Sequence, residues 1–439
     1  MTHRLSPLLL LLAAAGACAQ GKPKAAPVQQ VVKPPVAQAW VDLATHHSDM
    51  PGMAGALGQM MSGGGLPSLG QIFGRGDNTR GNTFGQTQGG FGFGASGQVM
   101  DTAVFSRANR GLSEAVQAVP AESLLAPSLQ LLAPQPEKPS YEPPPERDED
   151  REPQYEKPKG KLLLYWGCGE AVRAGQPRVL DFANMNLADV QRIMVARGST
   201  PQGARSQPGV PAWPNKTDDR KVPAGSRVAG EHAFSGQGIP EGFRFQIRPE
   251  NDFMPALAVQ RNPSPSGATL LRWQPLAQAR AYFISAMGGK PGEEGGAEMV
   301  MWTSSELPDT GFALHDYQTP AGLERLLKEQ VILPPATQEC AIPAGIFGGA
   351  GQGGPGGGGG MLRMMAYGPE QWAVHPPRPT DPKVAWEPQW QVRVRTKSSY
   401  FALLGMPGSE SGAPQEEQAP KEERKKPGVG DLLKGLFGR

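Results

Sequence analysis

Histidine and methionine residues gather in one short stretch near the start of the chain. The run His46-His47-Ser48-Asp49-Met50-Pro51-Gly52-Met53 precedes a second methionine pair, Met60-Met61, in a glycine-rich segment. Imidazole and thioether groups are ligands that copper accepts, and methionine sulfur suits the cuprous ion in particular. The sequence therefore raises the hypothesis of a copper site made by His46, His47, Met50 and Met53. The alternative is that the methionines cover apolar surface and that the histidine pair ends a strand.

The three cysteines of the chain are Cys18, Cys168 and Cys340. If Cys18 is removed or lipidated, the other two are left in an exported chain, where an oxidising compartment permits a disulfide between them. A closed loop of that length contributes on the order of 4–5 kcal/mol in the chain-entropy model. The alternative is two separate buried thiols, each acting as a small apolar residue. We expect the Cys168–Cys340 disulfide.

Motifs for known catalytic chemistry are absent from the sequence. It contains no Gly-x-Ser-x-Gly, His-Glu-x-x-His or Cys-x-x-Cys pattern. His232, His315 and His375 are isolated in sequence, and each is expected to be structural or on the surface. No catalytic residue and no cofactor is predicted, and copper is the alternative to the absence of a cofactor. A hydrolase stays open only through residues that the fold alone brings together.

The first residues have the layout of a secretory signal peptide. Arg4 is followed by an apolar run over residues 8–15 and then by small residues around Cys18. Cleavage after Ala19 would start the mature chain at Gln20, whereas residues 15–18 also resemble a lipobox in which Cys18 takes lipid. Both alternatives predict export to the periplasm, the outer membrane or the extracellular space. No other apolar stretch approaches the ~18 residues of a membrane span.

Composition divides the chain into folded and unfolded parts. A net charge of +2 argues against a nucleic-acid binder, which needs a basic face. The 58 Gly and 46 Pro are concentrated in particular segments, which predicts several parts. These are a signal peptide (1–19), a disordered leader (20–36), a β-rich module (37–133) with a mobile Gly/Met-rich loop (51–97), a disordered charged linker (134–160), a β-sandwich block (161–404) with a polyglycine insertion (348–360), and a disordered tail (405–428) before a terminal helix (429–439).

Hydrophobic alternation predicts a mainly β fold. Short apolar or alternating runs bounded by turn residues are typical of strands. In the second block they occupy residues 162–166, 178–182, 227–234, 243–248, 268–273, 280–287, 297–302, 338–347, 361–367 and 389–395. Two short helices are expected: one over residues 187–195, and one that opens at Thr319 and Pro320, where an N-cap precedes a proline in the first turn.

One part of this block resembles a known fold. Thr269-Leu-Leu-Arg-Trp273-Gln-Pro275, followed by Ala279-x-Ala-Tyr282-Phe-Ile, is similar to the second and third strands of a fibronectin type III or related immunoglobulin-like sandwich. The resemblance covers residues 268–405 and implies that Trp273 on one sheet packs against Tyr282 entering the other. Trp390-Gln-Val-Arg-Val-Arg395 resembles a late strand of that fold, although Trp390 stands where a Tyr is usual. The stretch 164–170 is also similar to exported proteins of proteobacteria. Neither resemblance implies an activity.

The terminal segment 429–439 places three leucines and Phe437 on one helical face. Such a short helix needs a surface to form on, which would be this protein's own sandwich, a partner protein of the envelope or a membrane. The sequence as a whole favours a non-enzymatic exported protein that binds or scaffolds. A copper-binding protein is the alternative, and a hydrolase of unrecognised type comes third.

Overall fold

A computed structural model of the chain describes residues 30–49, 82–88, 96–135, 160–292, 297–347 and 360–404. The signal peptide with Cys18, the methionines at 50, 53, 60 and 61, most of the linker 134–160, and the tail with its expected helix lie outside these residues. The described chain is mainly β, as the sequence predicts. Among these residues, no helix is long and apolar enough to span a membrane.

The elements follow one another in this order. The strands are β1 (Ala37–Ser48), β2 (Gly97–Ser106), β3 (Glu114–Ala118), β4 (Ser128–Leu132), β5 (Lys161–Trp166), β6 (Arg178–Asp181), β7 (Ala212–Trp213), β8 (Gly230–Ser235), β9 (Arg244–Ile247), β10 (Val259–Pro263), β11 (Thr269–Trp273), β12 (Ala281–Pro291), β13 (Ala297–Thr303), β14 (Glu339–Ile342), β15 (Gly360–His375) and β16 (Trp390–Leu403). The helices are α3 (Leu187–Ile193) and α4 (Pro320–Lys328), with 3-10 turns η1 (Ala121–Ser123), η2 (Pro249–Asn251) and η3 (Phe312–Leu314).

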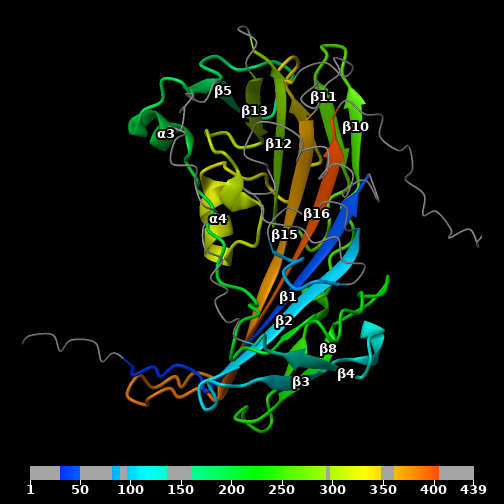
Figure 1. The fold of residues 1–439 in the computed structure, drawn as a ribbon, viewed down its shortest axis with the longest axis vertical. Helices are drawn as coiled ribbons and strands as arrows, with labels where there is room; N and C mark the ends of the chain where they lie inside the picture. Colours follow the sequence, from blue (N-terminus) through cyan, green and yellow to red (C-terminus); the bar gives the residue numbers. More distant parts are fainter. Residues whose placement is uncertain are drawn as a thin grey trace, which may run out of the picture.

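Within the described residues, thirteen strands form one mixed sheet in the order β6-β5-β13-β12-β15-β16-β1-β2-β7-β4-β3-β8-β9. A separate three-stranded sheet has the order β10-β11-β14. The long strands β12, β15, β16 and β1 run side by side along the molecule, with α4 on one side and β10 and β11 on the other (Figure 1). The two sequence blocks, 37–133 and 161–404, therefore share one sheet.

Strand β1 joins the two blocks because it has a partner on each edge. It pairs in parallel with β16 over its whole length and antiparallel with β2. Its side chains are buried on both faces, which is typical of a central strand. The strands on either side of β1 are remote from each other in sequence, so the pairing has no local signature.

Side chains of the long strands alternate between two faces. One face is apolar, and the other, called the polar face below, combines charged and polar residues with a second apolar cluster that packs against Leu323 and Leu326 of α4. On the apolar face, a core cluster that includes Tyr282, Ile284, Leu362 and Met364 packs against residues of the three-stranded sheet. There the Trp273 and Tyr282 rings meet edge to face at 5.6 Å between centroids. The Cys168–Cys340 disulfide, with Cα atoms 5.2 Å apart, joins the residues after β5 to β14. The pairing predicted from the sequence is thus present.

Two predicted disordered segments contain described residues that make defined contacts. Residues 30–36 of the predicted leader hydrogen-bond to the connection between β15 and β16, for example from Lys33 N to Trp386 O at 2.9 Å. Residues 82–88 of the predicted mobile loop form a turn that is held by Asp101. The predictions of disorder do not hold for these two stretches, because backbone hydrogen bonds to distant residues offset the ordering entropy there.

Candidate functional site

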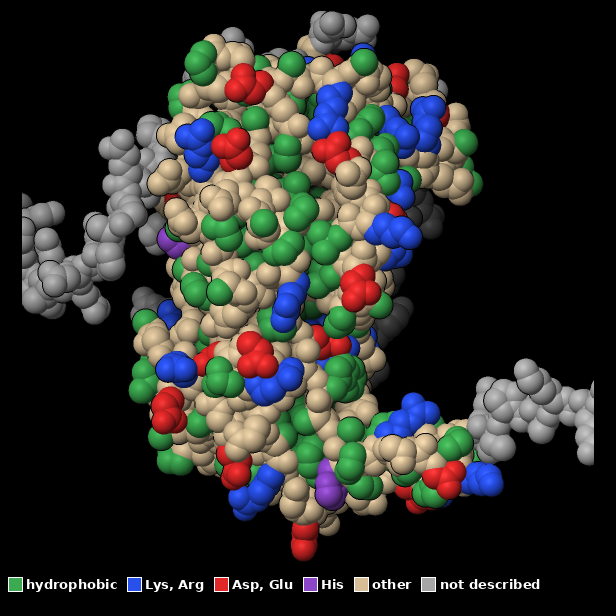
Figure 2. All heavy atoms as spheres, turned by 180° about the vertical axis from the view of Figure 1, so that it is seen from behind, with side chains coloured by type: hydrophobic (Ala, Val, Ile, Leu, Met, Phe, Trp, Pro, Cys, Tyr) green, Lys and Arg blue, Asp and Glu red, His purple; other side chains and the backbone are tan. Residues whose placement is uncertain are grey.

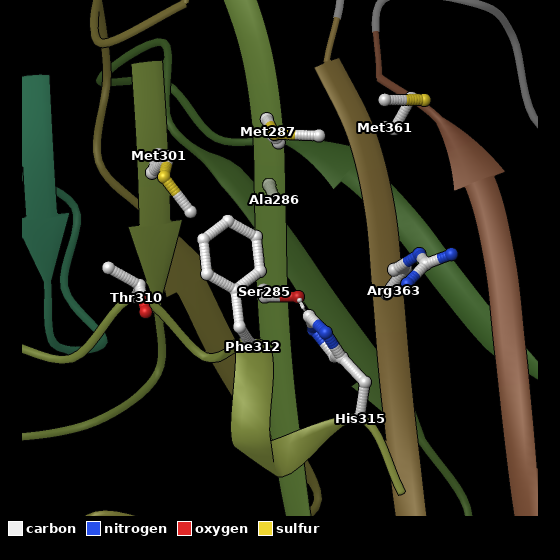
Figure 3. Close-up of a pocket in the computed structure, with 9 residues that line it drawn as sticks. All are labelled: Ser285, Ala286, Met287, Met301, Thr310, Phe312, His315, Met361 and Arg363. Carbon is white, nitrogen blue, oxygen red and sulfur yellow. Dashed lines mark hydrogen bonds between the residues drawn. The ribbon is translucent and has the colours of Figure 1, made fainter. Parts of the chain in front are cut away.

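A small pocket opens on the polar face of the sheet, between β12, β15 and the segment that carries η3. Ser285 of β12 and Arg363 of β15 are direct cross-strand partners and form its floor. His315 and Phe312 come from the η3 segment and cover them (Figure 3). The remaining lining residues are Ala286, Met287, Met301, Thr310 and Met361. The enclosed space is about 20 Å³, which is room for about one water molecule.

The polar end of this pocket is a hydrogen-bonded serine and histidine. Ser285 Oγ lies 2.7 Å from His315 Nε2, and both residues are buried. Burial lowers the pKa of His315 well below its ordinary value, and the positive charges of Arg363 and Lys397 lower it further. His315 is therefore neutral at pH 7, with one ring nitrogen that donates and one that accepts.

Arg363 makes the pocket electropositive. Its side chain is only 7% exposed, and burial lowers the pKa of its guanidinium group to about 9. That pKa still leaves the group protonated at neutral pH. Because Arg363 also lowers the pKa of both His315 and His46, its field extends across this face of the sheet.

The opposite end of the pocket is apolar and is lined mainly by methionine side chains. Met287, Met301 and Met361 stand around the upper part of the space, and the Phe312 ring lies across it (Figure 3). Phe312 is 39% exposed, so its ring is at the mouth and is not locked in the core. Methionine side chains are unbranched and adapt to the shape of what they contact. This wall can therefore widen more readily than the Ser285–Arg363 floor.

Further along the strands, the same face carries a buried ion pair. Arg395 of β16 lies directly opposite Asp42 of β1, with contacts of 2.6 and 2.9 Å between their side chains. Asp42 also accepts a hydrogen bond from the backbone N of Ala204 at 2.9 Å. Gly203 has no room for a side chain, since a Cβ there would lie 1.8 Å from Arg395 Nη2. The loop before β7 therefore closes over the pair.

A second buried cation, Lys397, completes the network. Its Nζ lies 2.7 Å from Asp316, and the ring of Tyr317 packs under both Lys397 and Arg395, at 4.4 and 4.1 Å. His315 belongs to the same segment as Asp316 and Tyr317. Residues 315–317 thus connect the pocket to the charged network, and the network fixes the position of His315.

Asp101 of β2 holds residues 82–88 in place on the same face of the sheet. It accepts hydrogen bonds from the backbone N of Gly85 at 3.0 Å and of Thr87 at 3.1 Å, and from the Thr87 hydroxyl. Burial raises the pKa of this carboxyl to about 7 despite these donors, and Asp42 opposite contributes to the rise. Asp101 therefore titrates near neutral pH while it anchors residues 82–88.

The residues of the predicted copper site are placed as follows. Both ring nitrogens of His46 have partners, Ser399 Oγ at 2.6 Å and Gln86 O at 2.9 Å. His47 stacks on Tyr400 and lies 3.6 Å from Asp49. Successive side chains of a strand point to opposite faces, so β1 directs the two imidazoles away from each other. Met50 and Met53 lie outside the described residues, and the copper site stays a prediction.

Sequence reasoning missed Ser285, His315 and Arg363 as one site. His315 was expected to be a structural or surface histidine, and it is buried in the pocket wall. His232 is also buried, between Gln117 and the carbonyl of Val228, whereas His375 stacks on Trp390. The signal that was available is Arg363 itself, a charged residue inside the apolar run 361–367 of a predicted buried strand.

Acid should destabilise this protein through its buried histidines. Burial lowers the pKa of His46 and of His232 to about 4, and that of His315 also lies below its ordinary value. A histidine with a depressed folded pKa contributes stability above its unfolded pKa of ~6.5 and loses it as pH falls. Asp101 and Asp309 oppose part of this loss, since burial raises the pKa of both carboxyl groups. We expect the free energy of unfolding to fall by about 2–3 kcal/mol per pH unit between pH 6 and 4.5.

Urea denaturation at several pH values checks this expectation. His232→Asn should reduce the slope by about 1.4 kcal/mol per pH unit in that window. Between pH 7.5 and 8.5 the variant and the wild type should show equal slopes, which is the internal control. A wild-type slope near zero below pH 6 would contradict the assignment of neutral buried histidines.

Comparison with known proteins found no relative whose function could be transferred to this chain. No family model, no curated protein and no solved structure matches the chain.

Proposed function

We propose that this chain is an exported binding protein without catalytic activity, and that the pocket on its polar face binds a small organic anion. The anionic group lies against Arg363, His315 and Ser285, and an apolar part lies against the methionines. Binding requires the Phe312 ring and the methionines to move outward, because the pocket without a ligand has room for about one water molecule. The observation that carries the proposal is a buried guanidinium group beside the Ser285–His315 pair, in the floor of a pocket whose opposite end is apolar.

The chemistry of the pocket floor selects negative charge. A guanidinium group donates to carboxylate or phosphate oxygens in a bidentate geometry. Ser285 Oγ and His315 Nε2 add two polar atoms on the same side. Ligand sites are generally apolar clefts with a few convergent polar groups, and this pocket has that composition.

The same electrostatics argue against copper in this pocket. Three methionine sulfurs and one imidazole would be suitable ligands for the cuprous ion. However, Arg363 and Lys397 both lower the pKa of His315, so the potential at its ring is positive. A positive potential repels a metal cation and attracts an anion. Copper remains the alternative function only through the predicted His46/His47 segment.

Isothermal titration with two probes tests the proposal. Octanoate and octyl phosphate share an apolar chain and differ in the anionic group, so the tighter binder identifies the preferred head. We expect one site per chain, and Arg363→Met should weaken binding at least tenfold. Arg393→Met is the matched control, because Arg393 is a buried arginine of the same face that packs over Trp372 and is not in the pocket.

Equal weakening by the two arginine variants would contradict the proposal, as would absence of binding to the wild type. Thermal melts of both variants show whether each is folded under the titration conditions. Arg363→Lys, which keeps the charge and loses the bidentate geometry, should bind with intermediate affinity.

Export and the sandwich resemblance are part of the proposal. The Cys168–Cys340 disulfide supports an oxidising compartment, which is consistent with the predicted signal peptide and with a place in the periplasm or at the cell surface. The contact between Trp273 and Tyr282 supports an immunoglobulin-like arrangement of the three-stranded sheet on the long strands. Lipidation of Cys18 is the alternative to its removal.

A hydrolase is the second candidate, and the Ser285–His315 hydrogen bond is the observation that favours it. A neutral histidine in contact with a serine hydroxyl can accept its proton during acyl transfer. A fluorophosphonate probe distinguishes the two functions. Covalent labelling of Ser285, detected by peptide mass, would favour the hydrolase, whereas no labelling together with octanoate binding favours the binding protein.

A further inference from the structure

The pocket is closed by part of the segment that connects β13 to α4. Residues 310–314 of this segment, called the lid below, place the Phe312 ring across the space that the methionines surround (Figure 3). The chain is anchored on both sides of the lid, by the buried Asp309 before it and by the Asp316–Lys397 pair after it. The lid is therefore the part of this segment that has to lift when a ligand enters.

A second segment lies against the lid. Residues 195–199, called the strap below, follow α3 and form neither helix nor strand. Arg197 N donates a hydrogen bond to Asp309 at 2.9 Å, and Thr310 N donates to Val195 O at 3.4 Å. Among the described residues that line the pocket, none belongs to the strap. The strap thus contacts the lid on a side that does not face the pocket.

Strap and lid are in close contact at Gly198. A Cβ atom at this position would lie 2.3 Å from Ala313 O and 2.7 Å from Leu314 Cδ2. Ala313 O is a backbone atom, so a side chain at position 198 would force the strap and the lid apart. The backbone of Gly198 is outside the left-handed region that favours glycine. Alanine is therefore opposed there by the contact with the lid and not by backbone strain.

The strap is held by few interactions besides those with the lid and Asp309. Arg325 of α4 donates a hydrogen bond to Arg197 O at 2.6 Å, and Ser199 N donates to Gln318 Oε1 at 3.0 Å. No residue of the strap is fully buried. Segments with little buried apolar surface and accessible hydrogen bonds open at a low free energy. The strap can therefore separate from the lid while the sheet stays folded.

Charge on the outer surface does not replace this opening step. On the face seen in Figure 2, Lys and Arg side chains are interspersed with Asp and Glu, without a large area of one sign. Long-range steering of an anion depends on such an area. Entry of a ligand to Arg363 is therefore controlled at the lid.

We propose that the strap, residues 195–199, keeps the lid closed over the pocket, and that the pocket admits its anion when strap and lid separate. This regulation rests on the proposed function, because it takes the pocket as the ligand site. When the open state is a minor fraction of the molecules, the apparent Kd is the intrinsic Kd divided by that fraction. Weakening the contact between strap and lid should therefore tighten ligand binding.

Hydrogen exchange followed by mass spectrometry tests the contact in the absence of ligand. Exchange of residues 309–316 should be at least fivefold faster in Gly198→Ala than in the wild type, while exchange of β12 stays unchanged. Gly111→Ala is the matched control, because a Cβ atom there would meet only Asn109 Oδ1, at 3.8 Å. This control should exchange at the wild-type rate in both segments.

Isothermal titration with octanoate gives the functional readout. Gly198→Ala should bind octanoate at least fivefold more tightly than the wild type does. Arg325→Met removes the contact between α4 and the strap and should change the affinity in the same direction. Glu329→Gln is its control, because it removes the ion-pair partner of Arg325 and leaves the contact with Arg197 O in place.

Three results would overturn this role of the strap. The first is equal exchange of residues 309–316 in Gly198→Ala and Gly111→Ala, and the second is an equal acceleration of exchange in β12, which would indicate global unfolding. The third is faster exchange of residues 309–316 without tighter octanoate binding. Absence of octanoate binding to the wild type would overturn the proposed function instead, and the exchange comparison would still decide whether the strap keeps the lid closed.

Discussion

Replacing Arg395 by Met will lower the free energy of unfolding by about 3–5 kcal/mol, because it leaves Asp42 buried without its cation. Asp42 is fully buried and Arg395 is 2% exposed. Burial by itself lowers the pKa of Arg395. The negative charge of Asp42 and its hydrogen bonds to the guanidinium group outweigh burial, so the pKa of Arg395 is raised. Chemical denaturation at pH 7 measures the effect. A loss below about 1 kcal/mol would show that the pair is hydrated in solution.

Two further variants give this measurement its controls. Glu329→Gln removes one partner of an exposed helical pair with Arg325 and should cost about 0.5 kcal/mol or less. The double variant Asp42→Asn/Arg395→Met removes both buried charges and should cost less than the two single variants added together. Additive losses would mean that the two side chains act separately.

Replacing both Cys168 and Cys340 by Ala will lower the free energy of unfolding by about 5 kcal/mol in the chain-entropy model. The cross-link closes a loop of 172 residues and joins the three-stranded sheet to the large one. Urea denaturation without reductant measures the loss. Wild-type protein treated with reductant should give the same value, since it loses the same covalent constraint.

A loss below about 1 kcal/mol in both preparations would contradict this expectation. It would indicate that the unfolded chain is already restricted over this loop or that the folded state relaxes when the bond is removed. The first cause predicts a changed denaturant slope, and the second predicts an unchanged one.

The elements that could be predicted from the sequence are those with local signals. Helix α4 begins where Thr319 accepts a hydrogen bond from Gly322 N at 3.0 Å, as its N-cap position predicts. The cysteine pair followed from elimination among three cysteines. The strand positions followed from alternation, although β15 runs on to His375, well past the predicted end at residue 367. A bulge between Tyr367 and Glu370 interrupts the alternation there and hides the second half of the strand.

The polar face could not be predicted, because its burial depends on distant residues. In Trp390–Lys397, valines alternate with Arg393, Arg395 and Lys397, a pattern that indicates one buried and one solvated face. In the structure, the face that this pattern predicts to be solvated is buried, because residues near Gly203 and the ring of Tyr317 cover it. The partner of Arg395, Asp42, is 353 positions away in the sequence. A pattern in the local sequence cannot predict that distant residues will bury this face, nor that Asp42 will pair with Arg395.

The pocket was missed for the same reason. Ser285 and Arg363 become neighbours only through the register of β12 and β15, and a shift of one residue in either strand would turn its side chain to the other face and separate the two. His315 then reaches Ser285 from a segment whose position depends on Lys397 and Asp316. Single-sequence patterns give the faces of strands, whereas register and loop placement decide which side chains meet.

A crystal structure of the protein soaked with 8-bromooctanoate tests the central claim most directly. The account predicts a bromine peak among Met287, Met301 and Met361, with the carboxylate within about 3 Å of the Arg363 guanidinium group and the Phe312 ring displaced. A pocket that keeps only water while the bromine peak lies elsewhere, or is absent, would contradict it.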